Sequence, residues 1–70
     1  MKLVNGSDEY WEYLNAAEGI YYDFCDAGSI DERRFHKKRG DKLKTILISE
    51  YGYRDESVKS IIDRYLDLRL

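Results

Sequence analysis

The sequence predicts an all-α protein, a small bundle of three or four helices joined by short connections. Proline is absent, and valine or threonine occurs only at Val4, Thr45 and Val58, a composition that favours helices over strands. Apolar residues recur three and four positions apart, the spacing that gives a helix one apolar side. Because 70 residues can enclose only one hydrophobic core, residues 1–70 are predicted to form a single helical domain.

The first helix is predicted to begin after Ser7, a good N-cap, with Asp8 and Glu9 in the first turn where the helix dipole favours acids. It is expected to end near Gly28, which would take the left-handed conformation common at helix C-termini. Cys25 lies on the apolar side and is expected to be a buried packing residue with no redox role. The full apolar side comprises Tyr10, Tyr13, Leu14, Ala17, Ile20, Tyr21, Phe24 and Cys25.

A second helix is predicted from Ser29, which forms a capping-box pattern with Glu32. Gly40 is expected to break this helix, because glycine costs about 1 kcal/mol relative to alanine inside a helix. Neighbouring like charges four positions apart also oppose continuity. Asp41 would then cap a new helix, whose inward residues are expected to be Leu43, Ile46, Leu47 and Tyr51.

The segment after Tyr51 is predicted to be a tight turn in which Gly52 takes a positive φ. Asp55 is expected to cap the last helix. The apolar stripe of that helix comprises Val58, Ile61, Ile62, Tyr65, Leu66 and Leu68. Taken together, the helical stripes predict a core that includes Leu14, Ala17, Tyr21, Phe24, Leu47, Val58, Ile61, Ile62 and Tyr65.

Charge is strongly segregated along the chain, although the net charge is only −2. Residues 1–32 carry one lysine against eight acidic residues, whereas residues 33–44 carry seven basic residues against Asp41 alone. Such segregation is informative about partners rather than about the fold.

The first helix carries acidic residues opposite its apolar side, and two aromatic residues at the border between the sides. Acidic surfaces bind basic grooves, as inhibitors that imitate nucleic-acid charge do, and border aromatics are typical interface anchors. The sequence therefore predicts a small non-enzymatic interaction protein that binds and modulates, or inhibits, a larger protein partner with a basic surface. Proteins of this type occur in phages and mobile elements. The predicted partner-binding residues are Trp11, Glu12, Glu18, Tyr22 and Asp23.

The basic block offers a second interaction surface. Clustered cations with interleaved aromatic residues, here Phe35 and His36, are typical of nucleic-acid contacts. The same block is equally explained by neutralisation against the acidic first helix within the fold. The predicted nucleic-acid-binding residues are Arg33, Arg34, Lys37, Lys38 and Arg39.

The segment 47–62 resembles the helix-turn-helix family of DNA-binding regulators. Leu47 and Tyr51 would line its first helix, Gly52 would lie at the turn, and Val58 and Ile61 would anchor the second helix. This resemblance implies a transcriptional regulator that contacts DNA as a homodimer.

Two features of the same segment depart from the helix-turn-helix pattern. Ile48 stands where a small residue is wanted, and the helix that would enter the groove carries Glu56, Asp63 and Asp67, which oppose a phosphate backbone.

Enzymatic chemistry has little support in the sequence. His36 is the only histidine and Cys25 the only cysteine, no metal-ligand spacing occurs, and there is no glycine-rich phosphate loop. We therefore expect neither an enzyme nor a cofactor or metal site. A lone cysteine and the lack of a long apolar run predict a cytoplasmic protein without a membrane association.

Overall fold

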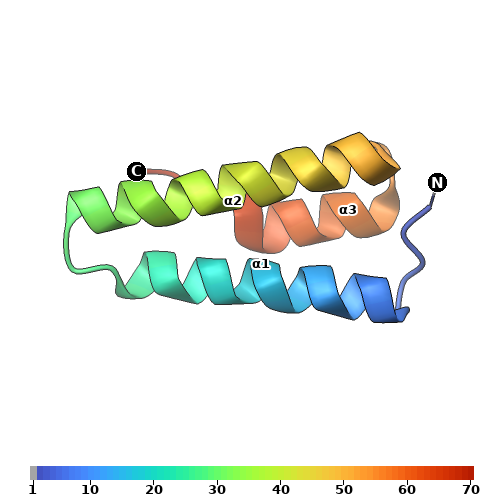
Figure 1. The fold of residues 1–70 in the computed structure, drawn as a ribbon, viewed down its shortest axis with the longest axis horizontal. Coiled ribbons are helices and arrows are strands. Elements are labelled where there is room, and N and C mark those ends of the chain that lie inside the picture. The colour runs from blue at the N-terminus through green and yellow to red at the C-terminus, as the bar shows by residue number, and fades with distance from the viewer. Residues whose placement is uncertain (1) are drawn as a thin grey trace.

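The computed structural model describes residues 2–70, which contain helices and no strand, so the all-α prediction is confirmed for this part of the chain. The helices are α1 (Asp8–Asp26), α2 (Ile30–Tyr51) and α3 (Glu56–Ile61), and α3 continues directly into a π-helical turn, η1 (Ile62–Leu66). α1 and α2 lie side by side in opposite directions, and α3 with η1 packs back against them (Figure 1). The structure is a small helical bundle with short connections.

The predicted helix starts after Ser7 and Ser29 are confirmed by their hydrogen bonds. Ser7 Oγ accepts from the Tyr10 backbone N–H at 3.2 Å, and Ser29 Oγ accepts from the Glu32 N–H at 3.2 Å. The Glu32 carboxylate accepts a hydrogen bond from the Gly28 N–H at 3.1 Å. In a capping box the donor would be the N–H of the N-cap residue itself, Ser29. Each serine thus satisfies a backbone donor that the first helical turn leaves open.

The end of α1 differs from the prediction. The helix ends at Asp26, and the chain continues through Ala27, whose backbone is extended (φ −60°, ψ 131°). Gly28 is not left-handed, because among the described residues only Gly6 and Gly52 have positive φ. The Glu32 carboxylate satisfies the backbone N–H of Gly28, so the connection between α1 and α2 forms without a left-handed residue.

The predicted break at Gly40 is wrong, and Asp41 is not a helix cap, because α2 runs without interruption from Ile30 to Tyr51. Gly40 is buried where α2 passes the C-terminal segment. A Cβ atom there would lie 3.0 Å from Leu68 Cδ1 and 3.6 Å from Ile20 Cγ2. The glycine therefore permits close approach between elements, and that packing outweighs its low helix propensity.

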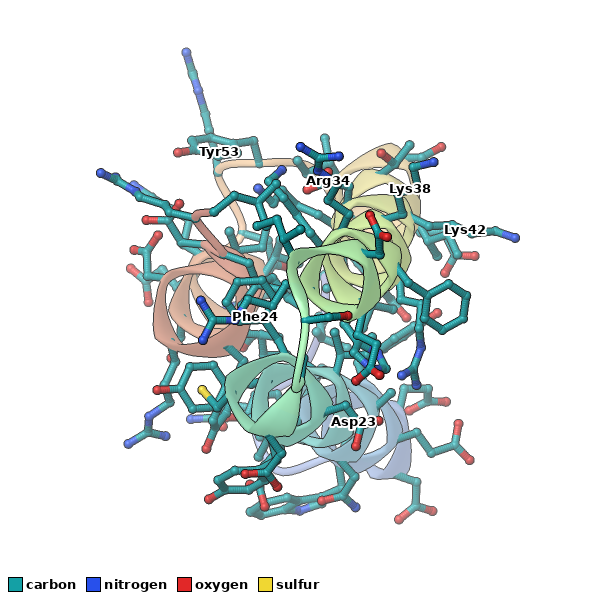
Figure 2. All side chains as sticks on the ribbon, turned by 90° about the vertical axis from the view of Figure 1, so that its left-hand side faces the viewer. Asp23, Phe24, Arg34, Lys38, Lys42 and Tyr53 are labelled. Carbon is teal, nitrogen blue, oxygen red and sulfur yellow. The ribbon has the colours of Figure 1, made fainter. Side chains whose placement is uncertain are left out.

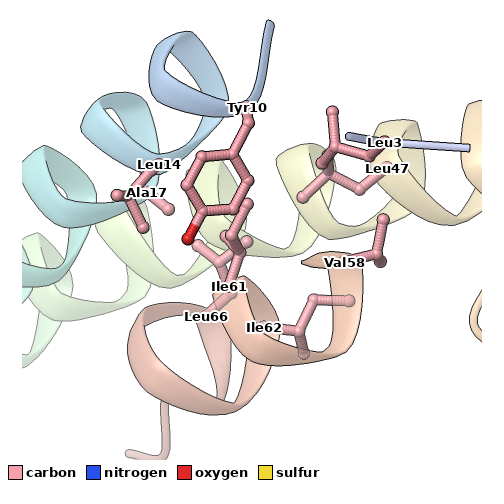
Figure 3. Close-up of a cluster of buried hydrophobic side chains, with 9 residues drawn as sticks. All are labelled: Leu3, Tyr10, Leu14, Ala17, Leu47, Val58, Ile61, Ile62 and Leu66. Atoms are coloured by element: carbon pink, nitrogen blue, oxygen red, sulfur yellow. The ribbon is translucent and has the colours of Figure 1, made fainter. Parts of the chain in front are cut away.

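The core is a cluster of buried apolar side chains from all the helices and the N-terminal segment (Figure 3). Six predicted positions are confirmed as buried: Leu14, Ala17, Leu47, Val58, Ile61 and Ile62. Three predicted core residues are only half-buried: Tyr21, Phe24 and Tyr65. Leu3, which no helical stripe predicted, is 1% exposed and belongs to the same cluster.

Two further predictions about buried residues are wrong. Cys25 is exposed rather than buried, because the buried residues of α1 end at Ile20 and the thiol lies beyond the core. Ile46 is 37% exposed, and Ile48 packs against the core instead. The buried residues of α2 are Gly40 and Leu47, and Ile46 and Ile48 project about 100° to either side of Leu47.

Asp55 joins the N-terminal segment to the start of α3. Its Oδ2 accepts from the Leu3 N–H at 2.8 Å, and its Oδ1 accepts from the Ser57 and Val58 N–H groups at 2.9 and 3.1 Å. Desolvation raises the pKa of Asp55, but these three donors lower it by more, so the pKa lies below its ordinary value. The predicted cap is confirmed, as is the positive φ of 97° at Gly52 in the preceding turn.

Polar contacts between α1 and α2 lie near both ends of the pair. Tyr13 donates to the Glu50 carboxylate at 2.9 Å, and Arg39 donates to the Asp23 carboxylate at 2.9 Å. The hydrogen bond to Glu50, together with burial, raises the pKa of Tyr13 to about 12. Both contacts are exposed and link the two long helices at the surface.

Replacing Gly40 tests the close approach of α2 to the C-terminal segment. Gly40→Val is expected to destabilise the protein by about 1–3 kcal/mol, because its methyl groups must displace Leu68 and Ile20. Gly40→Ala is expected to have a smaller effect, since its gain of about 1 kcal/mol in helix propensity offsets a contact with a flexible side-chain end. Urea unfolding followed by circular dichroism measures both. A valine variant as stable as the wild type would contradict the packing.

Asp55→Ala is expected to cost about 1–3 kcal/mol, the sum of a lost N-cap and a lost hydrogen bond to Leu3. Because the pKa of Asp55 is lowered in the folded state, its stabilisation is fully present above the unfolded pKa of about 4 and is lost as pH falls through the folded value. Urea midpoints of wild type and variant should therefore converge on acidification. A difference that stays constant with pH would show that the charge of Asp55 is irrelevant.

Cys25 provides a direct test of where the core ends along α1. Since its thiol is exposed, a thiol reagent should label the native protein at a rate similar to that of the urea-unfolded protein. Strong protection in the native state would mean that the apolar packing of α1 extends to its last turn.

Candidate interaction surface

The outward side of α1 carries a line of residues that we call the aromatic stripe: Trp11, Asn15, Glu18 and Tyr22. Their spacing of four, three and four positions places them on one side of a helix. Trp11 is 50% exposed and Tyr22 is 55% exposed, about three helical turns apart. Two large rings therefore face solvent from the same side of α1.

Small residues separate the two rings. Asn15 and Gly19 are both exposed, and apart from the two residues next to Gly19 and the backbone of the same helix, no atom lies within 4 Å of the position that a Cβ of Gly19 would occupy. Glu18 is the one long side chain of α1 between Trp11 and Tyr22 on this side, and it is half-buried and accepts a hydrogen bond from Tyr65. A partner side chain has access to the helix surface between the rings.

Other aromatic residues hold the two exposed rings in place. Trp11 contacts the buried Tyr10 edge-on, with ring centroids 5.3 Å apart. Tyr22 contacts Tyr21 at 5.8 Å, and Tyr21 in turn contacts Tyr65 at 5.7 Å. Packing of this kind restricts ring motion before any partner arrives.

Glu18 lies within this aromatic cluster and accepts a hydrogen bond from Tyr65 Oη at 3.2 Å. Burial raises the pKa of Tyr65, and the charge and hydrogen bond of Glu18 raise it further. The contact joins residues 47 positions apart, so no local pattern in the sequence points to it.

The other predicted partner-binding residues, Glu12 and Asp23, lie on an adjoining side of α1. Consecutive helical residues project about 100° apart, so Glu12 is rotated away from Trp11 and Asp23 from Tyr22. Glu12 is exposed and forms no ion pair within residues 2–70, whereas Asp23 pairs with Arg39 of α2. The structure thus brings Trp11, Glu18 and Tyr22 together and separates the two remaining acids from them.

The predicted nucleic-acid-binding residues all lie in the first half of α2, but their environments differ. Arg39 pairs with Asp23, and Lys37 pairs with Asp41 at 3.0 Å. Arg33, Arg34 and Lys38 are exposed and have no ion pair within the described chain. Within residues 2–70, a single ion pair, Asp23–Arg39, joins an acid of α1 to the basic block.

Lys42 belongs with this exposed basic group, although the sequence prediction stopped at Arg39. Figure 2 shows Arg34, Lys38 and Lys42 projecting from α2 on the side away from Asp23. Their spacing of four positions was available in the sequence. Lys42 lies in the basic block 33–44, but it was not among the five predicted nucleic-acid-binding residues.

The segment that resembles a helix-turn-helix has a different arrangement in the structure. α3 runs back beside α2 after the Gly52 turn (Figure 1), whereas the two helices of a helix-turn-helix cross at about 90–120°. α3 also spans only six residues before η1 begins. This geometry is that of a helical hairpin.

A surface hollow of about 520 Å³ lies between the N-terminal segment and α3. Glu56 contributes a carboxylate, and Ser57 and Ser60 contribute hydroxyls, but no histidine or cysteine lines it. The described residues contain no cluster of three histidine, cysteine or acidic side chains placed to hold a metal. They also contain no helix long and apolar enough to cross a membrane.

No protein-family model matches this chain, and no curated protein or solved structure gives a significant match either.

Proposed function

We propose that this protein is a small non-enzymatic interaction protein whose α1 surface binds and modulates, or inhibits, a larger protein partner with a basic surface, as inhibitors from phages and mobile elements do. The observation that supports this proposal is the pair of exposed rings of Trp11 and Tyr22 on one side of α1. Glu18 lies between them in the stripe, and Glu12 and Asp23 flank it.

Aromatic anchors are efficient because they bury much area at low entropic cost. A few tryptophan, tyrosine and arginine residues supply most of the binding free energy at typical interfaces. Trp11 and Tyr22 are already restrained by contacts with Tyr10 and Tyr21, so less ordering is required on binding. Open helix surface at Gly19 gives a partner side chain room to approach.

The charge around the stripe favours a cationic partner. Asp8, Glu12 and Asp26 are exposed on α1 and form no ion pair within residues 2–70. Rim charges of one sign accelerate association with an oppositely charged surface, and that acceleration weakens with salt. Glu18 adds a carboxylate whose position is fixed by Tyr65, ready to accept from an arginine.

The proposal places the protein in the cytoplasm, where a lone exposed thiol such as Cys25 stays reduced. It does not include the helix-turn-helix alternative, because α3 runs back beside α2 and carries Glu56, with Asp63 following in η1. A basic protein groove, rather than a DNA groove, suits the acidic α1 surface.

Trp11→Ala and Tyr22→Ala are each expected to weaken partner binding by roughly 30-fold, the effect of removing an interface hot spot of about 2 kcal/mol. Affinity capture from nuclease-treated lysate of the native host identifies the partner, and calorimetry with the purified partner measures the dissociation constants. Because Trp11 is the only tryptophan, its fluorescence should also shift to shorter wavelength in the complex.

Tyr53→Ala is the matched control, since Tyr53 is an aromatic residue of similar exposure, 56%, in the turn between α2 and α3. It should bind as the wild type does. Equal affinity for all three variants, or an equal loss with Tyr53→Ala, would show that the aromatic stripe is not the docking surface. Circular dichroism should confirm that all three variants remain folded.

A further inference from the structure

The outer side of α2 carries a row of three cations, Arg34, Lys38 and Lys42, which we call the cationic row. The residues are four positions apart, which spaces them about 6 Å apart along the helix axis. All three are exposed and project from the side of α2 away from Asp23 (Figure 2). None forms an ion pair within residues 2–70.

The surroundings of the cationic row leave its charge uncompensated. Asp41 is the one carboxylate between positions 34 and 49, and it is engaged by Lys37 at 3.0 Å and by Lys44 at 4.0 Å. Thr45 and Ser49 continue the same side of α2 with hydroxyl groups. Repulsion between like charges four positions apart opposes helix formation, and no ion pair offsets it along the row.

An exposed aromatic residue accompanies the row. Phe35 is 60% exposed, takes no part in the core, and contacts the His36 ring edge-on at 5.2 Å. It follows Arg34 directly and lies about one turn before Lys38. The exposed face of the Phe35 ring is accessible to a planar group of a partner.

We propose that the cationic row binds the phosphate backbone of a single-stranded nucleic acid, with Phe35 stacking on a base. A regular line of cations matches the regular negative charge of a polynucleotide, and an aromatic ring beside such a line is the usual platform for an unpaired base. A duplex keeps its bases stacked on one another and offers Phe35 nothing to stack on. This surface is separate from the aromatic stripe on α1, so the proposal goes beyond the proposed function and does not depend on it.

Fluorescence anisotropy with a labelled single-stranded oligonucleotide of mixed sequence, about 20 nucleotides long, tests the proposal. The wild type should bind at about 50 mM salt and lose affinity steeply toward about 200 mM. The triple variant Arg34→Gln/Lys38→Gln/Lys42→Gln should bind at least tenfold more weakly at low salt. The slope of log affinity against log salt should fall by about 2, the value for three lost phosphate contacts on a single strand.

The matched control is Lys59→Gln/Arg64→Gln/Arg69→Gln, which removes the same charge from the C-terminal part of the chain. It should keep affinity within about twofold and leave the salt slope nearly unchanged, because it removes no phosphate contact. Phe35→Ala should weaken single-strand binding by roughly 5- to 150-fold, as loss of one stacked base does. The row variant should unfold at a temperature no lower than the wild type, since it relieves repulsion within α2, and this excludes misfolding as the cause of lost binding.

Four results would overturn the proposal. These are no binding at low salt, an equal loss of affinity in both triple variants, tighter binding to a duplex of the same length, and competition by poly-glutamate as strong as by the unlabelled oligonucleotide. Trp11→Ala should bind the oligonucleotide as the wild type does, which keeps this test independent of the partner-binding surface of α1.

Discussion

The carboxylate of Asp55 is the contact on which this small core depends. One of its oxygens fixes Leu3, and the other begins α3 by accepting two backbone N–H groups. Leu3 is thereby buried against a cluster that also contains Leu47 and Val58. A 70-residue chain buries a limited share of its surface, so apolar side chains near both ends must join the core. One short acidic side chain positions both of these segments.

The helix N-caps, which are set by neighbouring residues, were predictable from the sequence, and features set by distant residues were not. Ser7, Ser29 and Asp55 cap helices through donors two or three positions away, so their pattern in the sequence is sufficient. Gly40 has the local character of a helix breaker, yet its role is decided by Leu68, which lies 28 positions later. The burial of Leu3 likewise requires knowledge of where Asp55 lies in space.

The same division applies to the candidate surfaces. Helical periodicity was enough to place Trp11 and Tyr22 together at the border of the apolar side, where both are exposed. It did not predict that Asp23 would be engaged by Arg39, or that Glu18 would be held by Tyr65, because these contacts join different helices. Helix geometry alone separates Glu12 from the aromatic stripe. The sequence prediction grouped the acids of the first helix as one face and therefore did not make this distinction.

The arrangement of the core explains how one small domain has room for two distinct surfaces. α3 and η1 supply Val58, Ile61, Ile62 and Leu66, all buried, whereas α2 supplies Leu47 and Gly40 along its 22 residues. The short C-terminal helix therefore closes the core, and the exposed residues Trp11 and Tyr22 of α1 and Arg34, Lys38 and Lys42 of α2 are not part of it. Substitutions there change charge and aromatic area without opening a cavity. The two proposed binding surfaces, on α1 and on α2, can consequently be altered separately from the core and from each other.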